Sequence, residues 1–204
     1  MENLPLENAR RWISPFEGDG NGVPVSVFFT QNAYHQAVRH ASSSLDFEVG
    51  GILVGKWCED SGSARQYIVI SACLPARFTQ QGSVFLTFTQ DSLVDIHAKI
   101  DEMYPEDAIV GWYHTHPRMG VFLSQYDTWL HNHFFPEPWQ VALVIEPLAD
   151  IGGFFIRQAS GLLDPGWYSG FYELDENSGQ SIVHWNNLKQ GPAEAEDKGV
   201  DHNE

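Results

Sequence analysis

"GWYHTHPRMGVFLSQYD", residues 111–127, joins an apparent strand to an apparent helix and carries the side chains of a possible metal site. Residues two apart in a strand point to the same side, so His114 and His116 can direct both imidazoles to one point. Pro117 then ends strand pairing, and Ser124 and Asp127 share one face of a first helical turn. Two imidazoles and a carboxylate are the ligand set of a catalytic zinc site that keeps its fourth position for water.

Each half of this stretch also has an ordinary structural explanation. A His-x-His pair in a strand can be two partly buried histidines without a metal. Ser-x-x-Asp is a capping pattern, in which Ser124 accepts backbone N–H bonds and Asp127 interacts favourably with the helix dipole. Neither pattern alone therefore distinguishes a metal site from a capped helix after a strand.

The rest of the chain extends this strand–helix order in both directions. The composition, with 43% apolar and 19% charged residues, is typical of a globular protein. Apolar periodicity and turn residues predict strands at 23–30, 48–58, 66–74, 107–116, 139–147 and 152–160, and helices at 31–44, 89–105 and 124–135. A β-rich order with helices packed over the strands predicts an α/β sandwich.

Four segments follow from this pattern. We expect an N-terminal extension at 1–23 that is loosely held, a main domain at 24–163, an aromatic-rich addition at 164–190 and a disordered acidic tail at 191–204. The aromatic-rich addition is predicted to form an edge hairpin, with an interface for a partner as the alternative. A second independent core would be crowded in 204 residues.

Charge and hydropathy exclude several classes of function. The net charge of −16, with only 11 Lys and Arg, argues against broad nucleic-acid binding, which needs cations for the phosphates. No apolar run approaches the roughly 20 residues that cross a bilayer, and the N-terminus lacks the apolar core of a signal peptide. We therefore expect a cytoplasmic protein that does not bind membranes.

The two cysteines are expected to remain thiols. If the strands 48–58 and 66–74 form a hairpin, Cys58 pairs with about residue 65 and Cys73 lies well away from it. A reducing compartment fits this arrangement, and no Cys-x-x-Cys is present to suggest a structural zinc.

Together with Glu48 at the head of "EVGGILVG", the stretch 111–127 resembles the JAMM family, also called the MPN domain or Mov34 family. The family pattern is an upstream glutamate, His-x-His-Pro, a short spacer and Ser-x-x-Asp. "GWYHTHP" and "VALVIEP" are similar to the proteasomal and signalosome isopeptidases of this family, and the resemblance covers roughly residues 25–160. It implies an MPN-type, cytidine-deaminase-like fold, which is a mixed curved β-sheet flanked by helices.

The resemblance also implies a role for each residue of the pattern. His114, His116 and Asp127 would bind one Zn²⁺ per chain, and zinc lowers the pKa of a bound water to about 7. Glu48 would act as general base and then general acid, and Ser124 would donate to the oxyanion of the tetrahedral intermediate. The implied reaction is hydrolysis of an (iso)peptide bond at the C-terminus of ubiquitin or a ubiquitin-like protein.

Residues around the implied site are less specific. His131 lies four after Asp127 and is predicted to lie behind the site or at the surface, because a fourth protein ligand would close the water position. Trp112 and Trp129 flank the site, and Trp112 and Phe85 are the candidates for substrate binding. The loop 76–88 could add a strand beside a substrate tail or belong to the core.

Two alternatives to an isopeptidase function remain open. Some JAMM relatives process sulfur-carrier proteins or peptide-like metabolites, and some MPN domains have lost metal ligands and act as scaffolds. The segment "LADIGG" at 148–153 is short. This favours an isopeptidase that has broad substrate specificity or a single partner, rather than an isopeptidase that is specific for one chain linkage. Conjugates of ubiquitin or of a ubiquitin-like protein are the expected partners, and the sequence makes no prediction about oligomeric state.

Overall fold

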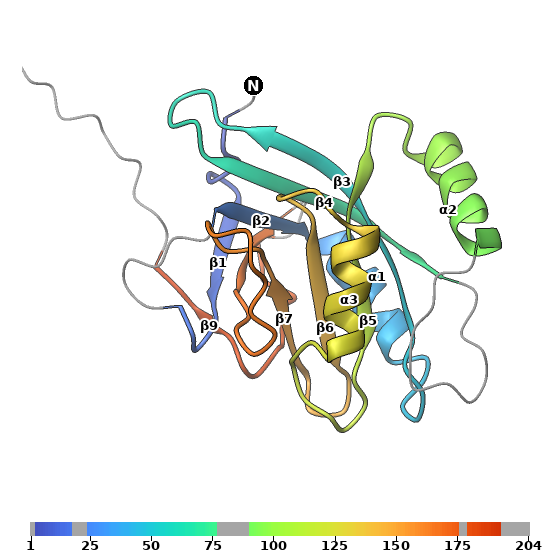
Figure 1. Ribbon diagram of the computed structural model, residues 1–204. Helices are drawn as coiled ribbons and strands as arrows, with labels where there is room; N and C mark the ends of the chain where they lie inside the picture. The colour runs from blue at the N-terminus through green and yellow to red at the C-terminus, as the bar shows by residue number, and fades with distance from the viewer. Residues whose placement is uncertain (1–2, 18–23, 77–89, 176–178, 193–204) are drawn as a thin grey trace, which may run out of the picture.

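The computed structural model describes residues 3–17, 24–76, 90–175 and 179–192 of the chain (Figure 1). Its elements, in chain order, are β1 (Ala9–Ile13), β2 (Val25–Thr30), α1 (Gln31–Ala41), β3 (Gly50–Glu59), β4 (Gln66–Pro75), α2 (Gln90–Met103), β5 (Ala108–Thr115), α3 (Gln125–Phe134), β6 (Val141–Glu146), β7 (Ile151–Phe155), β8 (Phe171–Leu174) and β9 (Lys189–Gln190). Among these residues, no helix combines the length and the apolar character needed to cross a membrane.

The described strands form one mixed sheet in the order β7-β6-β5-β3-β4-β2-β8-β1-β9. The pairs β2–β4, β2–β8 and β5–β6 are parallel, and the other neighbours are antiparallel. The prediction of an α/β fold with a mixed sheet and flanking helices is therefore confirmed.

Strand β5 lies between β6 and β3 in the sheet and is covered on both faces. Trp112 faces α3, where its ring stacks on Phe135, whereas Tyr113 faces α1 and its hydroxyl lies 2.8 Å from Nδ1 of His40. Since successive strand residues point to opposite faces, the two helices lie on opposite sides of the sheet. Residues 110–115 are therefore all buried, including the polar His114 and Thr115 at the end of the strand.

The predicted hairpin of strands 48–58 and 66–74 and the predicted short connection after "IEP" agree with the structure. Strands β3 and β4 pair antiparallel, and Cys58 lies opposite Tyr67 rather than residue 65. Cys73 lies opposite Leu53, and no disulfide joins the two cysteines. Strands β6 and β7 are joined by a turn, so the connection after β6 is short as predicted. The loop 77–89, which includes Phe85, lies outside the described residues.

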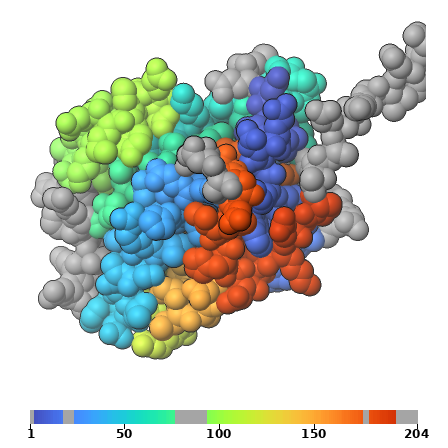
Figure 2. Space-filling view, turned by 180° about the vertical axis from the view of Figure 1, so that it is seen from behind, coloured from blue at the N-terminus to red at the C-terminus, as the bar shows by residue number. Residues whose placement is uncertain are grey.

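The two ends of the chain differ from the prediction. Residues 9–13 are not a loose extension, because β1 pairs with β8 and β9. The segment 164–190 does not form an edge hairpin, since β8 lies between β1 and the parallel strand β2. Figure 2 shows the N-terminal residues in blue packed beside the C-terminal residues in orange and red. Residues 193–204 of the acidic tail lie outside the described part.

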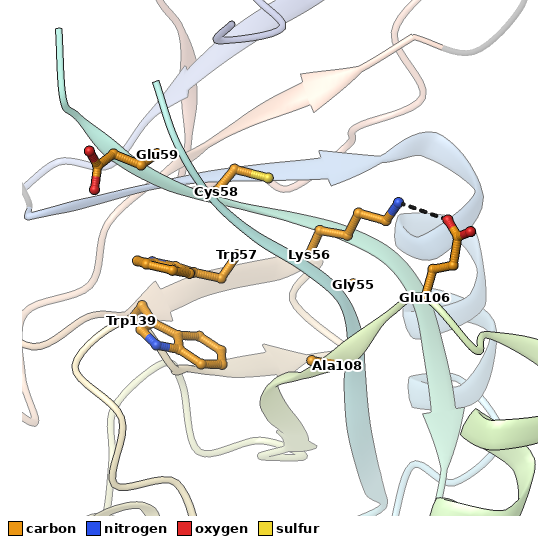
Figure 3. A pocket seen from close by; sticks show the side chains of 8 residues that line it. All are labelled: Gly55, Lys56, Trp57, Cys58, Glu59, Glu106, Ala108 and Trp139. Carbon is orange, nitrogen blue, oxygen red and sulfur yellow. Dashed lines mark hydrogen bonds and ion pairs between the residues drawn. The ribbon is translucent and has the colours of Figure 1, made fainter. Parts of the chain in front are cut away.

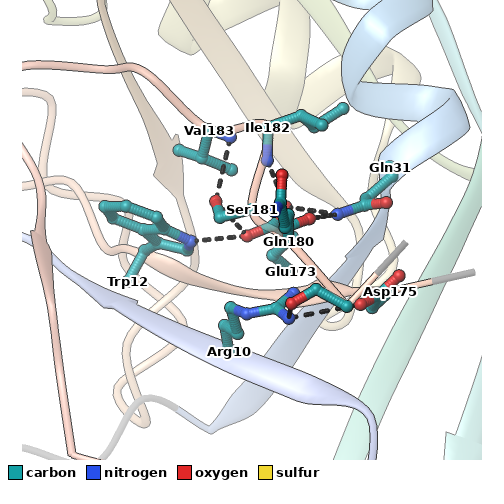
Figure 4. A network of polar contacts seen from close by, with 10 residues as sticks. Arg10, Trp12, Gln31, Glu173, Asp175, Gln180, Ser181, Ile182 and Val183 are labelled. Atoms are coloured by element: carbon teal, nitrogen blue, oxygen red, sulfur yellow. Dashed lines mark hydrogen bonds and ion pairs between the residues drawn. The ribbon is translucent and has the colours of Figure 1, made fainter. Parts of the chain in front are cut away.

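A buried carboxylate ties these two ends to the rest of the sheet (Figure 4). Glu173 in β8 is fully buried and accepts hydrogen bonds from Trp12 Nε1 at 3.1 Å and Gln31 Nε2 at 2.8 Å. It also accepts from the Ser181 hydroxyl at 2.6 Å and the Ile182 N–H at 2.9 Å. One side chain therefore connects β1, the first turn of α1, β8 and the segment after residue 179.

We expect Glu173→Ala to lower the free energy of unfolding by about 3 to 5 kcal/mol, because it leaves several buried donors without an acceptor. Chemical denaturation followed by tryptophan fluorescence measures this change. Glu102→Ala, at an exposed position of α2, is the matched control and should stay within about 0.5 kcal/mol of wild type. Equal stabilities of the two variants would show that the network around Glu173 does not hold the chain ends.

Candidate metal centre

Three side chains from β5, the following loop and α3 converge at one point. Nε2 of His114 lies 2.9 Å from Nε2 of His116, and the two nitrogens lie 3.5 Å and 3.6 Å from Oδ2 of Asp127. All three residues are buried. The structure therefore brings together the three predicted ligands.

Local backbone structure fixes each of these side chains. The parallel pairing of β5 with β6 places His114 beside Val144, and the His116 N–H continues the ladder by donating to the Ile145 carbonyl at 2.9 Å. Ser124 caps α3 by accepting from the Asp127 N–H at 3.1 Å, while the Ser124 N–H donates to Oδ2 of Asp127 at 2.7 Å. This capping box orients the carboxylate toward the two histidines.

The electrostatics of the three groups favour a cation between them. Burial lowers the pKa of His114, which disfavours a protonated ring. Burial alone would raise the pKa of Asp127, but hydrogen bonds from His114 and His116 hold it well below its usual value. An ionised Asp127 carboxylate beside the Nε2 atoms of two buried histidines suits a metal ion.

The spacing of the donor atoms can be compared with that of a zinc site. Ligand atoms at 2.0–2.2 Å from a tetrahedral zinc lie about 3.3 to 3.5 Å apart, and the observed separations of 2.9, 3.5 and 3.6 Å lie around these values. Two nitrogens and one oxygen are also donors that zinc accepts. The residues present therefore fit a zinc ion.

Behind the donor atoms lies a buried aromatic layer. Trp112 is fully buried, stacks on the His114 ring with centroids 4.5 Å apart, and donates from Nε1 to Nδ1 of His131 at 3.1 Å. Burial lowers the pKa of His131 to about 3, so this ring is neutral. His131 thus lies behind the site, one of the two predicted places, and supports the tryptophan. The Nδ1 atoms of His114 and His116 have no hydrogen-bond partner within the described part of the chain.

Glu48 lies just before β3, opposite the end of β5. The Val49 N–H donates to Oγ1 of Thr115, and the Thr115 N–H donates to the Val49 carbonyl, which holds this segment against the strand. Oε1 of Glu48 lies 3.9 Å from Nε2 of His116, and the carboxylate side chain is 9% exposed. Burial raises the pKa of Glu48 to about 7, and nearby Asp127 adds to this shift.

Sequence reasoning missed the residue that joins the two halves of the site. Arg118 has a left-handed backbone with φ of 65°, and its N–H donates to the buried carboxylate of Glu146 at 3.1 Å. Its guanidinium donates to the Leu45 carbonyl and to Asp46, just upstream of Glu48. The only sequence signal was its position after Pro117, which does not identify these contacts.

The predicted substrate-binding residues are not supported. Trp112 is 0% exposed, so it cannot contact a substrate at the surface of the site, and that prediction is wrong. Phe85 lies outside the described residues. Trp129 is exposed on α3. Phe122, in the spacer between the two motifs, is also exposed, and its ring lies 4.7 Å from that of His116.

These features define an α/β protein with a mixed sheet, helices on both faces and a candidate metal centre at the end of an interior strand. The family model described as JAB1/Mov34/MPN/PAD-1 ubiquitin protease matches residues 24–135, more than half of the chain. The chain therefore belongs to the JAB1/Mov34/MPN/PAD-1 family.

Individual proteins show the same relationship at low identity. The chain is 32% identical over 123 residues to NAD(+) hydrolase TcpA of Theionarchaea archaeon, covering 60% of this chain and 34% of that protein. It is 24% identical over 146 residues to ubiquitin carboxyl-terminal hydrolase RPN11 of Saccharomyces cerevisiae, covering 69% and 45%. The chain thus spans less than half the length of either relative.

A solved structure supports the fold. Protein DSY2949 from Desulfitobacterium hafniense superposes with a TM-score of 0.51 and 19% identity, covering 78% of this chain and 98% of that chain. At this identity the likeness concerns the fold alone.

Proposed function

We propose that this chain is a zinc-dependent hydrolase that cleaves an (iso)peptide bond at the C-terminus of ubiquitin or a ubiquitin-like protein. The observation that carries the proposal is a carboxylate placed beside the three ligands. Glu48 reaches within 3.9 Å of His116 without joining the His114–His116–Asp127 triangle, so it can move protons while the other three side chains hold the metal.

The proposed role of each residue follows from these positions. His114, His116 and Asp127 would hold the zinc ion, which would supply a Lewis acid that polarises the scissile carbonyl and activates a water. Oε1 of Glu48 accepts a proton from the attacking water and delivers it to the departing amine. Burial raises the pKa of Glu48 above the usual value for a glutamate, which favours both transfers.

Ser124 has a second part in this proposal. Its Oγ accepts the Asp127 N–H in the capping box, which leaves the hydroxyl proton available for donation. In the reaction the hydroxyl donates to the oxyanion that forms on the scissile carbonyl, an interaction that strengthens in the transition state. The capping and the catalytic roles therefore use different parts of one hydroxyl group.

The surface beside the site suits an extended peptide. Phe47, Met119 and Phe122 are exposed apolar residues next to Glu48, the Arg118 loop and His116. Apolar side chains beside an open site can bind a peptide through burial of its apolar groups. The ubiquitin substrate class rests on the family match and on the name of the Saccharomyces cerevisiae relative.

NAD hydrolysis is not proposed as a second candidate function. The archaeal relative carries that name as a whole protein, and this chain aligns with only 34% of it. The alignment therefore does not place that activity in the shared part. No feature of the described site favours a nucleotide over a peptide.

The proposed function predicts cleavage of ubiquitin-like conjugates that is unaffected by thiol-directed reagents. The assay incubates the metal-loaded protein with a ubiquitin-like protein joined to a lysine or as a C-terminal fusion, with and without iodoacetamide. We expect release of the ubiquitin-like protein in both reactions, with rates that agree within about twofold, because neither Cys58 nor Cys73 belongs to the proposed chemistry.

Two other results would point elsewhere. Bound zinc without cleavage of any ubiquitin-like conjugate would favour processing of a sulfur-carrier protein or a peptide-like metabolite. A folded protein that binds no metal would favour a scaffold. Either result contradicts the proposed function.

A further inference from the structure

Among the described residues, no hydrogen bond fixes the second ring nitrogen of His114. Nε2 of His114 points toward His116 and Asp127, whereas Nδ1 is buried and has no partner within the described part of the chain. A metal-binding histidine usually donates from its other ring nitrogen to a carboxylate, a carbonyl or water, and this bond sets the direction of the ring. Within the described part, the direction of the His114 ring therefore depends on its packing contacts.

The main packing contact of this ring is with Trp112. The two rings stack with centroids 4.5 Å apart and planes 8° apart. Trp112 and His114 are two residues apart in β5, so their side chains lie on the same face of the strand, and both are fully buried. A tilt of the His114 ring would collide with the indole, because a close-packed interior leaves no space for it. The direction of the ligand therefore depends on the direction of the Trp112 ring.

His131 on α3 holds the Trp112 ring in place. Nε1 of Trp112 donates to Nδ1 of His131 at 3.1 Å, and the His131 side chain is fully buried. An indole N–H is only a donor, so Nδ1 of His131 accepts and the ring proton of His131 lies on Nε2. Burial and the nearby Arg157 charge both lower the pKa of His131, which keeps the ring neutral and Nδ1 able to accept. The two rings are therefore joined by a hydrogen bond of fixed direction.

The end of α3 completes this buried layer. The Phe135 ring stacks on Trp112 and on His131, with ring centroids 6.0 Å apart in both pairs. Arg157, which follows β7, donates to the Phe135 carbonyl at 2.8 Å. Aromatic rings packed in this way do not tilt independently of one another. Helix α3 and the segment after β7 therefore hold the ring on which the ligand His114 lies.

We propose that His131 is a positioning residue for the metal centre, which acts by accepting the indole N–H of Trp112. The hydrogen bond fixes the Trp112 ring, and the stacked Trp112 ring directs Nε2 of His114 toward the metal. This inference rests on the proposed function, because it requires that His114 binds zinc. His131 contacts neither the metal nor the substrate in this proposal, and its expected effect is on the affinity for zinc.

A buried histidine can also be an ordinary part of the core, and the two roles require different properties of residue 131. If the side chain only fills space, another side chain of similar size should preserve zinc affinity. If it fixes Trp112, it must accept a hydrogen bond. His131→Leu keeps a buried side chain of similar size without an acceptor, whereas His131→Gln offers an amide oxygen to the indole N–H. The pair of variants therefore separates the two roles.

Zinc affinity is measured by competition with a fluorescent chelator, which does not depend on hydrolysis of any substrate. We expect His131→Leu to weaken zinc binding at least about 10-fold, the scale for residues that support a metal ligand, and His131→Gln to stay within about threefold of wild type. Ile70→Ala is the control for loss of stability, because Ile70 is fully buried in β4 and β3 separates that strand from β5. Its zinc affinity should stay within about twofold of wild type, with folding of all variants checked by thermal denaturation.

A change at Trp112 tests whether His131 acts through this ring. Trp112→Phe keeps an aromatic ring but removes the indole N–H, so it should weaken zinc binding at least about 10-fold. Adding His131→Leu to this variant should cause no further loss, because the hydrogen bond is already absent.

Trp57→Phe is the matched control for Trp112→Phe. Trp57 stacks on Trp139 in a groove that Ala108, the first residue of β5, also lines (Figure 3). The proposed ligands lie at the other end of β5, and none of them lines the groove. The zinc affinity of Trp57→Phe should therefore stay within about twofold of wild type.

The hydrogen bond itself can be observed in the metal-free protein. Each of the seven tryptophans gives one indole signal in a ¹H–¹⁵N spectrum, and the Trp112 signal is the one that Trp112→Phe lacks. We expect this signal to move upfield in His131→Leu, because the N–H loses its acceptor, and to stay near its wild-type position in His131→Gln. This measurement follows the Trp112–His131 contact without a bound metal.

Two results would overturn the role of His131 while leaving the proposed function intact. One is wild-type zinc affinity in a folded His131→Leu protein whose Trp112 signal has moved. The other is an equal loss of affinity in His131→Leu and His131→Gln, which would show that only the packing of the imidazole ring matters. A folded wild type that binds no zinc would contradict the metal site, and with it both proposals. The expected pattern of zinc affinities without any hydrolysis would contradict the proposed function alone.

Discussion

Glu48→Gln is expected to retain the metal and to lower the rate of hydrolysis by about 10²-fold or more, the usual scale for general acid–base catalysis. Glutamine preserves the shape of the side chain but cannot accept a proton from the attacking water. Because Glu48 lies outside the group of three ligands, the change should leave metal content at the wild-type value.

The pH dependence of the rate gives a second measurement of the same role. Glu48 must be ionised to accept a proton, so the wild-type rate should fall as the pH drops through the pKa of this carboxyl group. Burial places that pKa at about 7, and a bound cation lowers it, so the decline should lie below pH 7. Glu48→Gln should lack this acid limb.

Glu102→Gln on α2 is the matched control, since it makes the same chemical change at an exposed position. It should retain both the rate and the acid limb. A rate near the wild-type value in Glu48→Gln, measured with a substrate that the wild type cleaves well, would show that the proposed proton transfer is wrong.

His116→Ala is expected to abolish stoichiometric zinc binding and, with it, measurable hydrolysis. The remaining donors, His114 and Asp127, supply only two of the three protein ligands of a catalytic zinc site. Elemental analysis of the purified protein measures the zinc content directly, and the expected wild-type value is about one ion per chain.

His133→Ala is the control for this change, because His133 lies on the same helix as Asp127 but is exposed. It should keep both zinc and activity. Treatment of the wild type with a chelator should reproduce the loss of activity seen in His116→Ala. Unchanged zinc content in a folded His116→Ala protein would remove His116 from the set of ligands.

The part of the fold that carries the candidate site was predictable because its signals are local. The two-residue spacing in β5 and the three-residue spacing at the start of α3 each fix the direction of a pair of side chains. The distance between the pairs is set by the loop 116–124, which no periodicity describes. Only the resemblance to a known family indicated that the two pairs come together. The same resemblance indicated that Glu48, which is far away in the sequence, belongs to the site.

The ends of the sheet were not predictable in the same way. Strand β8 pairs with β2, and the two are separated by about 140 residues, so no local pattern indicates the partner. Strand β1 has the sequence "ARRWI", which does not show the alternation of a half-buried strand. Its pairing depends on β8 and on the hydrogen bond from Trp12 to Glu173, and both lie at the other end of the chain.

Burial was the other property that sequence reasoning misjudged. Trp112 was a candidate for substrate binding because it is near the histidines in sequence. Residue 112 instead points, like His114, to the face that α3 covers, and its ring fills the space between His114 and Phe135. A large aromatic residue next to a ligand therefore indicated support for the ligand rather than contact with a substrate.

The position of β8 between β2 and β1 also has a consequence for the order in which the protein folds. During synthesis, the edge of β2 cannot pair with β8 until residues 171–174 have left the ribosome, long after β2 itself has emerged. Contacts with such large sequence separation slow folding, and an exposed strand edge promotes aggregation in the meantime. A fragment that ends at residue 163 would keep this edge open permanently, so it should aggregate during expression although it contains every residue of the candidate metal centre.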